Sequence, residues 1–150
     1  YQHITREIGK GAHQKKVLQY SYTVVQPSRY FMSVLNSAEV RSFIGAVMNK
    51  KIQKIEGKIY TFGWKDYTLL NDTSAEKPGT DIIIDCTSGW DDTCGGSLVY
   101  VDGTGEYTRI PAHENTLIIA QRKKKVQKFV QYVNHHATGR KRVLFIGKIK

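Results

Sequence analysis

The stretch from Asp81 to Leu117 constrains the fold more than any other part of the chain. Its extended runs, each rich in apolar or β-branched side chains, are residues 82–86, 98–101, 106–110 and 116–120. Glycines and aspartates separate these runs, for example at Gly89 and Gly103. Short β-branched runs bounded by turn-forming residues are typical of antiparallel strands. Strands this short must pair to satisfy their backbones, so we expect an antiparallel sheet or sandwich as the core.

A helix is predicted to cover this sheet, over about residues 36–49. Asn36 and Glu39 have the spacing of a capping box at its start. Apolar residues then recur at helical spacing, and they are Val40, Phe43, Ile44, Val47 and Met48. A stripe of this kind packs against a sheet. A short helical turn is expected just before it, at Tyr30–Leu35.

The other upstream segments predict more β-structure. Tyr20–Val25 is aromatic and β-branched and predicts a strand. Residues 51–62 predict a hairpin that turns at Gly57, because two apolar runs flank this glycine. Residues 1–19 show little periodicity and are expected to form a loosely ordered arm or an edge element. Residues 71–80 are polar and contain Pro78 and Gly79, which predicts a loop.

Length and composition fit one folded domain spanning residues 1–150. A chain of 150 residues with 40% hydrophobic and 24% charged residues can bury a core. No apolar run is long enough to cross a bilayer, and no signal peptide is visible after Tyr1. The two cysteines, Cys86 and Cys94, do not argue for an oxidising compartment. We therefore expect a cytoplasmic protein without a membrane partner.

The net charge of +10 is concentrated at one end of the sequence. The first 114 residues hold 13 basic and 13 acidic residues, whereas the last 36 hold ten basic residues and no acidic residue. Such an excess attracts polyanions such as RNA, although it is also compatible with an inert solvated edge. The predicted polyanion-binding residues are Arg122, Lys123, Lys124, Lys125, Lys128, Arg140, Lys141 and Arg142. Aromatic residues that could stack on bases are Tyr100, Tyr107, Phe129 and Tyr132, although we expect most of them to lie in the core.

Several motifs together resemble a known family. They are Trp90-Asp91-Asp92, Gly95-Gly96 before Leu98, Pro111 with Asn115-Thr116-Leu117, Trp64–Asp72, Lys128–Asn134 and Arg140–Ile149. This pattern, over roughly residues 36–150, is similar to the double-stranded β-helix of iron- and 2-oxoglutarate-dependent oxygenases. It most resembles the C-terminal domain of prolyl hydroxylases that modify a ribosomal protein, a domain that carries no iron. The resemblance implies an α+β, mainly β fold, a cupin-like jelly roll.

The resemblance also indicates where an iron site would lie, and the expected ligands are missing from those positions. Such oxygenases hold Fe(II) with two histidines and a carboxylate. Asn71 and Thr73 stand at the first two ligand positions, with Asp72 one residue out of register. The distal histidine is expected near Gln127 or Lys128, where an ammonium would repel the metal. Arg142 stands at the position that binds the carboxylate of 2-oxoglutarate.

Other catalytic chemistry finds little support in the sequence. His135 and His136 are adjacent and would face opposite sides of a strand. Asp91 and Asp92 are better explained by turn formation than by acid–base chemistry. Gly95-Gly96 lacks the lysine and helix of a phosphate-binding loop. We therefore predict no catalytic residues, no metal ligands and no cofactor.

Three functions follow from these observations. The first is a non-catalytic oxygenase-like domain that binds a protein partner. The second is association with RNA or the ribosome through the basic C-terminal third, and it does not exclude the first. The third is a divergent prolyl hydroxylase-type dioxygenase that uses Fe(II) and 2-oxoglutarate with an unusual ligand set.

Overall fold

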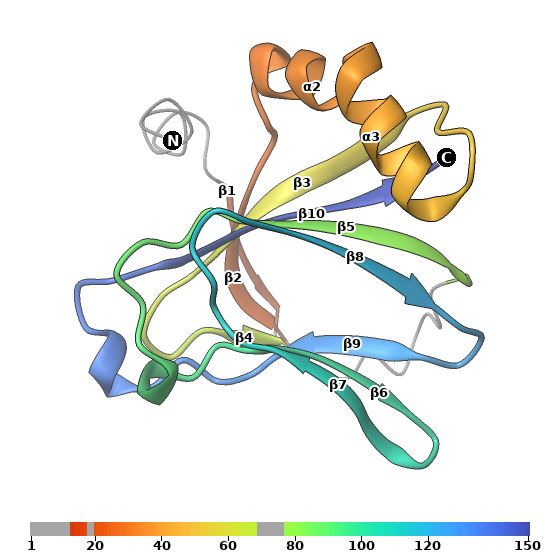
Figure 1. Ribbon diagram of the computed structural model, residues 1–150. Helices are drawn as coiled ribbons and strands as arrows, with labels where there is room; N and C mark the ends of the chain where they lie inside the picture. Colours follow the sequence, from red (N-terminus) through yellow and green to blue (C-terminus); the bar gives the residue numbers. More distant parts are fainter. Residues whose placement is uncertain (1–12, 18–19, 69–76) are drawn as a thin grey trace.

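The computed structural model describes residues 13–17, 20–68 and 77–150. The described chain forms two antiparallel sheets that face each other, with a pair of helices above the larger sheet (Figure 1). The strands are β1 (His13–Val17), β2 (Tyr20–Val25), β3 (Ile55–Phe62), β4 (Tyr67–Thr68), β5 (Gly79–Asp85), β6 (Leu98–Asp102), β7 (Gly105–Ile110), β8 (Thr116–Arg122), β9 (Gln127–Val130) and β10 (Arg142–Ile149).

The strand order is that of a jelly roll. The larger sheet runs β1-β2-β3-β10-β5-β8, with β4 paired to β2, and the smaller sheet runs β7-β6-β9. Neighbouring strands within both sheets are antiparallel. The predicted α+β, mainly β fold and its double-stranded β-helix are therefore confirmed. The extended runs of the stretch from Asp81 to Leu117 became β5, β6, β7 and β8.

Two apolar cores hold the layers together. One lies between the helices and the outer face of the larger sheet, where Ile44 packs with Ile82 and Phe145. The other lies between the sheets, where Ile83 and Leu144 pack with Leu98. Side chains alternate between the two faces of a strand, so β5 and β10 each supply both cores. In the described part of the chain, no helix is long and apolar enough to cross a membrane.

The helices are α2 (Arg29–Leu35) and α3 (Ala38–Met48), and the predicted cap was one residue out of place. The Ser37 hydroxyl, not Asn36, accepts a hydrogen bond from the Val40 amide and caps α3. Asn36 instead ends α2, and its side chain bonds the backbone N–H and carbonyl of Ile55, at 2.8 and 3.0 Å. It thereby fixes the helices to β3.

The apolar stripe of α3 is only partly buried. Ile44 lies in the core, and Val40 and Met48 pack against it. Phe43 and Val47, however, keep 60% and 61% of their surface exposed. The prediction that the whole stripe covers the sheet was therefore wrong for these two residues, which lie on the outer side of the helix.

The predicted hairpin at Gly57 was wrong, because residues 55–62 form the single strand β3. Gly57 lies opposite Gly147 on β10. A Cβ atom on Gly57 would come within 2.6 Å of both the Gly147 Cα and the Phe145 ring. The glycine therefore permits a close approach of two strands under an aromatic ring, and it makes no turn.

The segment at residues 1–19, predicted as an arm or an edge element, contains the edge strand of the larger sheet. His13–Val17 form β1, which pairs with β2, while residues 1–12, 18 and 19 lie outside the described residues. The short 3₁₀ helices η1 (Asp92–Cys94) and η2 (His135–Ala137) lie together at one end of the sandwich (Figure 1). The turn between β8 and β9 lies at the opposite end.

Candidate functional site

The space between the sheets contains two buried aspartates, both from β5. Asp81, Ile83 and Asp85 alternate along the strand and point toward the smaller sheet, where Ile83 packs in the core. The side chains of Asp81 and Asp85 are fully buried. Four residues along an extended strand correspond to about 13 Å, so each aspartate forms its own cluster, with apolar packing between them.

The Asp81 cluster joins strands of both sheets. The carboxylate accepts hydrogen bonds from the Lys128 ammonium at 2.9 Å, the Arg122 guanidinium at 3.3 Å and the Tyr100 hydroxyl at 3.1 Å. Arg122 also donates to the Lys77 carbonyl at 2.7 Å. Burial by itself would raise the pKa of Asp81, but Lys128 and Arg122 outweigh it and hold that pKa below its ordinary value of 3.8.

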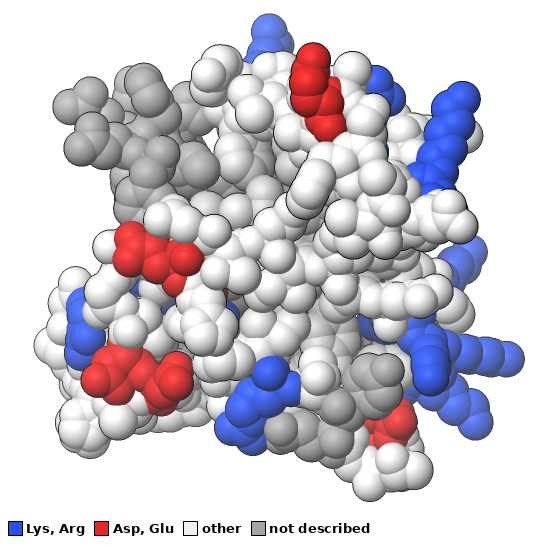
Figure 2. Space-filling model, viewed as in Figure 1, with Lys and Arg blue, Asp and Glu red and all other residues white. Residues whose placement is uncertain are grey.

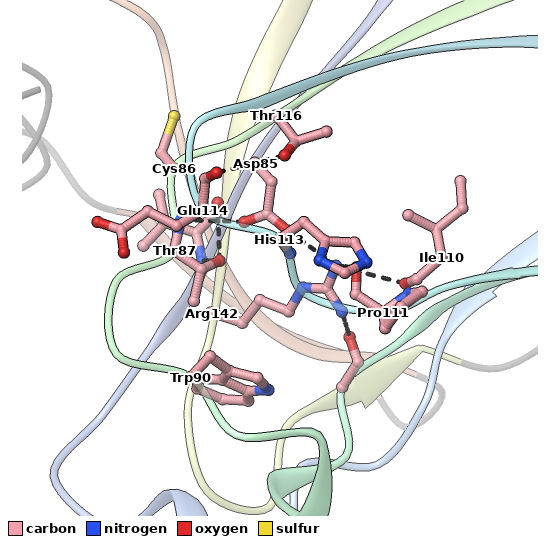
Figure 3. Close-up of polar contacts among 12 residues, drawn as sticks. Asp85, Cys86, Thr87, Trp90, Ile110, Pro111, His113, Glu114, Thr116 and Arg142 are labelled. Atoms are coloured by element: carbon pink, nitrogen blue, oxygen red, sulfur yellow. Dashed lines mark hydrogen bonds and ion pairs between the residues drawn. The ribbon is translucent and has the colours of Figure 1, made fainter.

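The Asp85 cluster closes the other end of the interior (Figure 3). Its carboxylate accepts from the Arg142 guanidinium at 3.1 Å and from the backbone amides of Thr87 and His113 at 2.9 and 3.0 Å. Arg142 is fully buried and donates further bonds to the Pro111 carbonyl at 3.1 Å and to the Gly96 carbonyl. Burial lowers the pKa of Arg142, and Asp85 opposes this effect.

The Gly95-Gly96 pair shapes the backbone around Arg142. Both glycines have left-handed φ angles, 73° and 74°. A Cβ atom on Gly95 would come within 2.4 Å of the Tyr132 carbonyl oxygen, and one on Gly96 would meet Val133 at 3.0 Å. The pair therefore brings the Gly96 carbonyl to the guanidinium, a structural role that agrees with the absence of a phosphate-binding loop.

The iron ligand set is not supplied by the described residues. Asn71 and Thr73, at the first two ligand positions, lie outside them. Lys128, near the distal histidine position, is held by Asp81, and Arg142 is held by Asp85 at the other end of the interior. In residues 13–17, 20–68 and 77–150, no three His, Cys, Asp or Glu side chains are grouped closely enough to hold a metal ion. These residues do not fit Fe(II).

The remaining candidates for catalysis are at the surface or inert. His135 and His136 are exposed in η2, with their ring centres 4.1 Å apart and the rings tilted by 37°. Asp91 caps η1 by accepting from the Thr93 amide at 2.7 Å, as turn formation predicted. Burial raises the pKa of the Cys86 thiol to about 11, which keeps it protonated at neutral pH.

The eight predicted polyanion-binding residues do not share one surface. Arg122 and Arg142 are buried, and Lys128 is largely buried, because all three bond aspartates of β5. These three must be removed from the predicted surface. The other five split between two ends of the sandwich, with Lys123, Lys124 and Lys125 in the β8–β9 turn and Arg140 and Lys141 beyond β9 (Figure 1). The single strand β9 between the groups places them at opposite ends.

The predicted stacking residues also separate. Tyr100 is buried and bonds Asp81, Phe129 is partly buried, and Tyr132 is half exposed. The side chain of Tyr107 lies outside the described residues.

Asp81 and Asp85, the centres of both clusters, were missed by the sequence reasoning. Their spacing was a usable signal, because two acids four apart in an apolar strand share one face.

Asp81 should make stability fall in acid. Because its pKa is lowered in the folded state, its contribution is present above the ordinary carboxyl pKa of 3.8 and is lost as pH falls below that value. Replacing Asp81 with Asn should therefore lower stability at pH 7 and flatten its decline below about pH 4. Urea unfolding at several pH values measures this effect. The exposed control Glu114→Gln should follow the parent, and an unchanged slope for Asp81→Asn would contradict the prediction.

The comparisons with known proteins agree with this architecture. Three solved structures share the fold. An oxidoreductase of the 2OG-Fe(II) oxygenase family from Burkholderia pseudomallei matches with TM-score 0.73 and 12% identity, covering 99% of this chain and 77% of that one. A Pseudomonas putida prolyl-4-hydroxylase matches with TM-score 0.69 and 12% identity, covering 99% and 82%. A Trichoplax adhaerens prolyl hydroxylase, in complex with a hypoxia inducible factor peptide, matches with TM-score 0.65 and 7% identity, covering 99% and 74%.

The sequence itself identifies the family. No curated protein sequence matches the chain. The family profile described as oxoglutarate and iron-dependent oxygenase degradation C-term, however, matches residues 9–147. This match covers almost the whole chain and agrees with the motifs around Trp90 and Asn115. The chain therefore belongs to the family of C-terminal domains of oxoglutarate- and iron-dependent oxygenases.

Proposed function

We propose that this domain is a non-catalytic relative of the oxygenases and acts as a binding module for RNA or the ribosome. The first half of this proposal, the lack of catalysis, rests on the ion pairs that two cations form in the interior. Lys128 and Arg142 stand where the resemblance expects an iron ligand and the cosubstrate arginine, and each bonds a buried aspartate of β5.

These two ion pairs disfavour the binding of Fe(II) and of 2-oxoglutarate. Fe(II) would have to approach an ammonium, and 2-oxoglutarate would have to displace Asp85 from Arg142. Displacement is costly because it leaves a buried carboxylate without its cation. Two clusters that lie about 13 Å apart along β5 also do not form one compact site for a metal and its cosubstrate.

The second half of the proposal, RNA binding, rests on the positive net charge of the chain. The net charge of +10 is large for 150 residues, and the last 36 residues contain no acid. Exposed lysines attract phosphates by Coulomb forces and release counterions on binding. The resemblance to hydroxylases of a ribosomal protein makes ribosomal RNA a natural target to test first.

The function is tested by RNA binding together with metal analysis. The purified domain should bind a 20-nucleotide mixed-sequence RNA in 50 mM salt, with an affinity that falls steeply as salt rises. It should contain iron well below one equivalent, by elemental analysis, after expression in iron-supplemented medium. Absence of RNA and ribosome binding would contradict the binding role. Stoichiometric iron would instead favour the divergent dioxygenase.

A further inference from the structure

The end of the sandwich opposite η1 and η2 carries lysines at or next to the ends of three neighbouring strands, β10, β5 and β8. We call this the lysine end and define it as Lys77, Lys123, Lys124, Lys125, Lys148 and Lys150. All six side chains are exposed. Figure 2 shows Lys and Arg side chains projecting along the right-hand edge of the molecule, where this end lies.

Sheet register brings these lysines together from distant parts of the sequence. The end of β10 and the end of β8 both lie beside the beginning of β5, because β5 is antiparallel to each of them. In the sheet, Lys148 is opposite Asp81, and Gly79 is opposite Arg122. Adjacent strands are about 4.8 Å apart, so the charges that these strand ends carry lie close together on the scale of the Debye length, about 8–10 Å.

Acidic residues at this end do not cancel the positive charge. Glu56 bonds both Lys54 and Lys150, so two cations surround one carboxylate. Asp102, at the end of β6, accepts from the amide and hydroxyl of Thr104 at 2.8 and 2.6 Å, and its charge also interacts with that of Lys123. Among the described residues, lysines therefore outnumber carboxylates at this end of the sandwich.

We propose that the lysine end is the RNA-binding surface of this domain, and that it contacts the phosphate backbone. This inference rests on the proposed function and assigns it a location. It includes Lys77, which lies outside the basic C-terminal third of the sequence. It excludes Arg140 and Lys141, which were predicted to bind polyanions but which lie at the far end.

The chemistry of this surface fits a phosphate backbone better than a membrane or a protein. All six cations are lysines, which contact phosphates as point charges without the paired geometry of arginine. Phosphate contacts position a protein and carry no sequence information. In the described part of the chain, the large apolar side chains that are exposed belong to segments other than those that define the lysine end: Tyr30, Val34, Phe43, Val47, Trp64, Leu117 and Tyr132. Membrane insertion and protein interfaces both depend on such side chains.

Two triple variants with equal charge test the location. The first is Lys123→Gln, Lys124→Gln and Lys125→Gln at the lysine end. The control is Lys65→Gln, Arg140→Gln and Lys141→Gln at the opposite end. Both remove three positive charges, and the control also removes the hydrogen bonds that Arg140 donates to the Gly89 and His136 carbonyls. The binding of a labelled 20-nucleotide mixed-sequence RNA is measured by fluorescence anisotropy from 50 to 300 mM salt.

The lysine-end variant should flatten the slope of log K against log salt by about two, because each lost contact with a single strand contributes about 0.7. The control should keep the parental slope, and both should melt close to the parent. Equal slopes for the two variants would overturn the inference while leaving RNA binding in place. A parent that binds no RNA would overturn the proposed function itself. Displacement of RNA by polyglutamate of equal charge at the same concentration would overturn the commitment to RNA.

Discussion

Replacing Arg142 with Met should destabilise the domain by about 3–5 kcal/mol, the usual cost of removing one partner of a buried ion pair. The variant leaves the Asp85 carboxylate buried without its cation, and it leaves the Pro111 and Gly96 carbonyls without a donor. Urea unfolding followed by circular dichroism measures the loss. The exposed neighbour Lys141→Met should stay within about 0.5 kcal/mol of the parent.

A double variant separates the charge from the packing. In Asp85→Asn with Arg142→Met, no unpaired charge remains. The Thr87 and His113 amides bond different carboxylate oxygens of Asp85, so the single amide oxygen of the asparagine can keep only one of these two bonds. Removing both charges of a buried pair is often close to neutral, so this variant should recover much of the stability lost by Arg142→Met. A double variant no more stable than the single one would contradict the ion-pair account, as would a single variant within about 1 kcal/mol of the parent.

Trp90→Ala should cost about 3 kcal/mol, the lower part of the range for large aromatic residues because the side chain is only partly buried. The indole N–H donates to the Gly95 carbonyl at 3.0 Å, and the ring packs on the core between the sheets. It also lies 3.3 Å from the position of a Cβ on Gly96. Its loss would loosen the glycine pair that faces Arg142.

Trp64 provides a matched control for this prediction. Its side chain is 48% exposed, and the Lys65 ammonium lies 4.4 Å from its ring centre. Trp64→Ala should therefore change the stability by less than about 1 kcal/mol. Thermal unfolding of both variants compares them directly. If Trp90→Ala melts within a degree or two of the parent, Trp90 has no structural role and a binding role gains support.

Local sequence patterns predicted the strands well. They predicted poorly the contacts between residues that are far apart in the chain. The strands between Asp81 and Leu117 were identified because turn residues bound each β-branched run. Gly57 was misread because a glycine that permits close approach to Gly147 looks the same in sequence as one that makes a turn. The predicted helix cap was one residue too early because Asn36 and Ser37 are adjacent and both residue types can cap a helix.

The buried clusters could not be derived from local pattern. Asp81 meets its cations 41 and 47 residues later in the chain, and Asp85 meets Arg142 after 57 residues. The basic run at Arg122 suggested a surface turn, and only the pairing of β8 with β5 shows that its first residue turns inward. Strand alternation placed Arg122 on the same face as Ile118 and Ala120, a signal that the charge of the run obscured.

The central claim is that the chain's own ion pairs occupy the place of metal and cosubstrate. Calorimetric titration of 2-oxoglutarate into the purified domain, with Fe(II) present under anaerobic conditions, tests it most directly. We expect no binding heat for either ligand, because Lys128 and Arg142 are held by Asp81 and Asp85. Saturable binding of 2-oxoglutarate with a micromolar dissociation constant, lost in Arg142→Met but retained in Lys141→Met, would contradict the account.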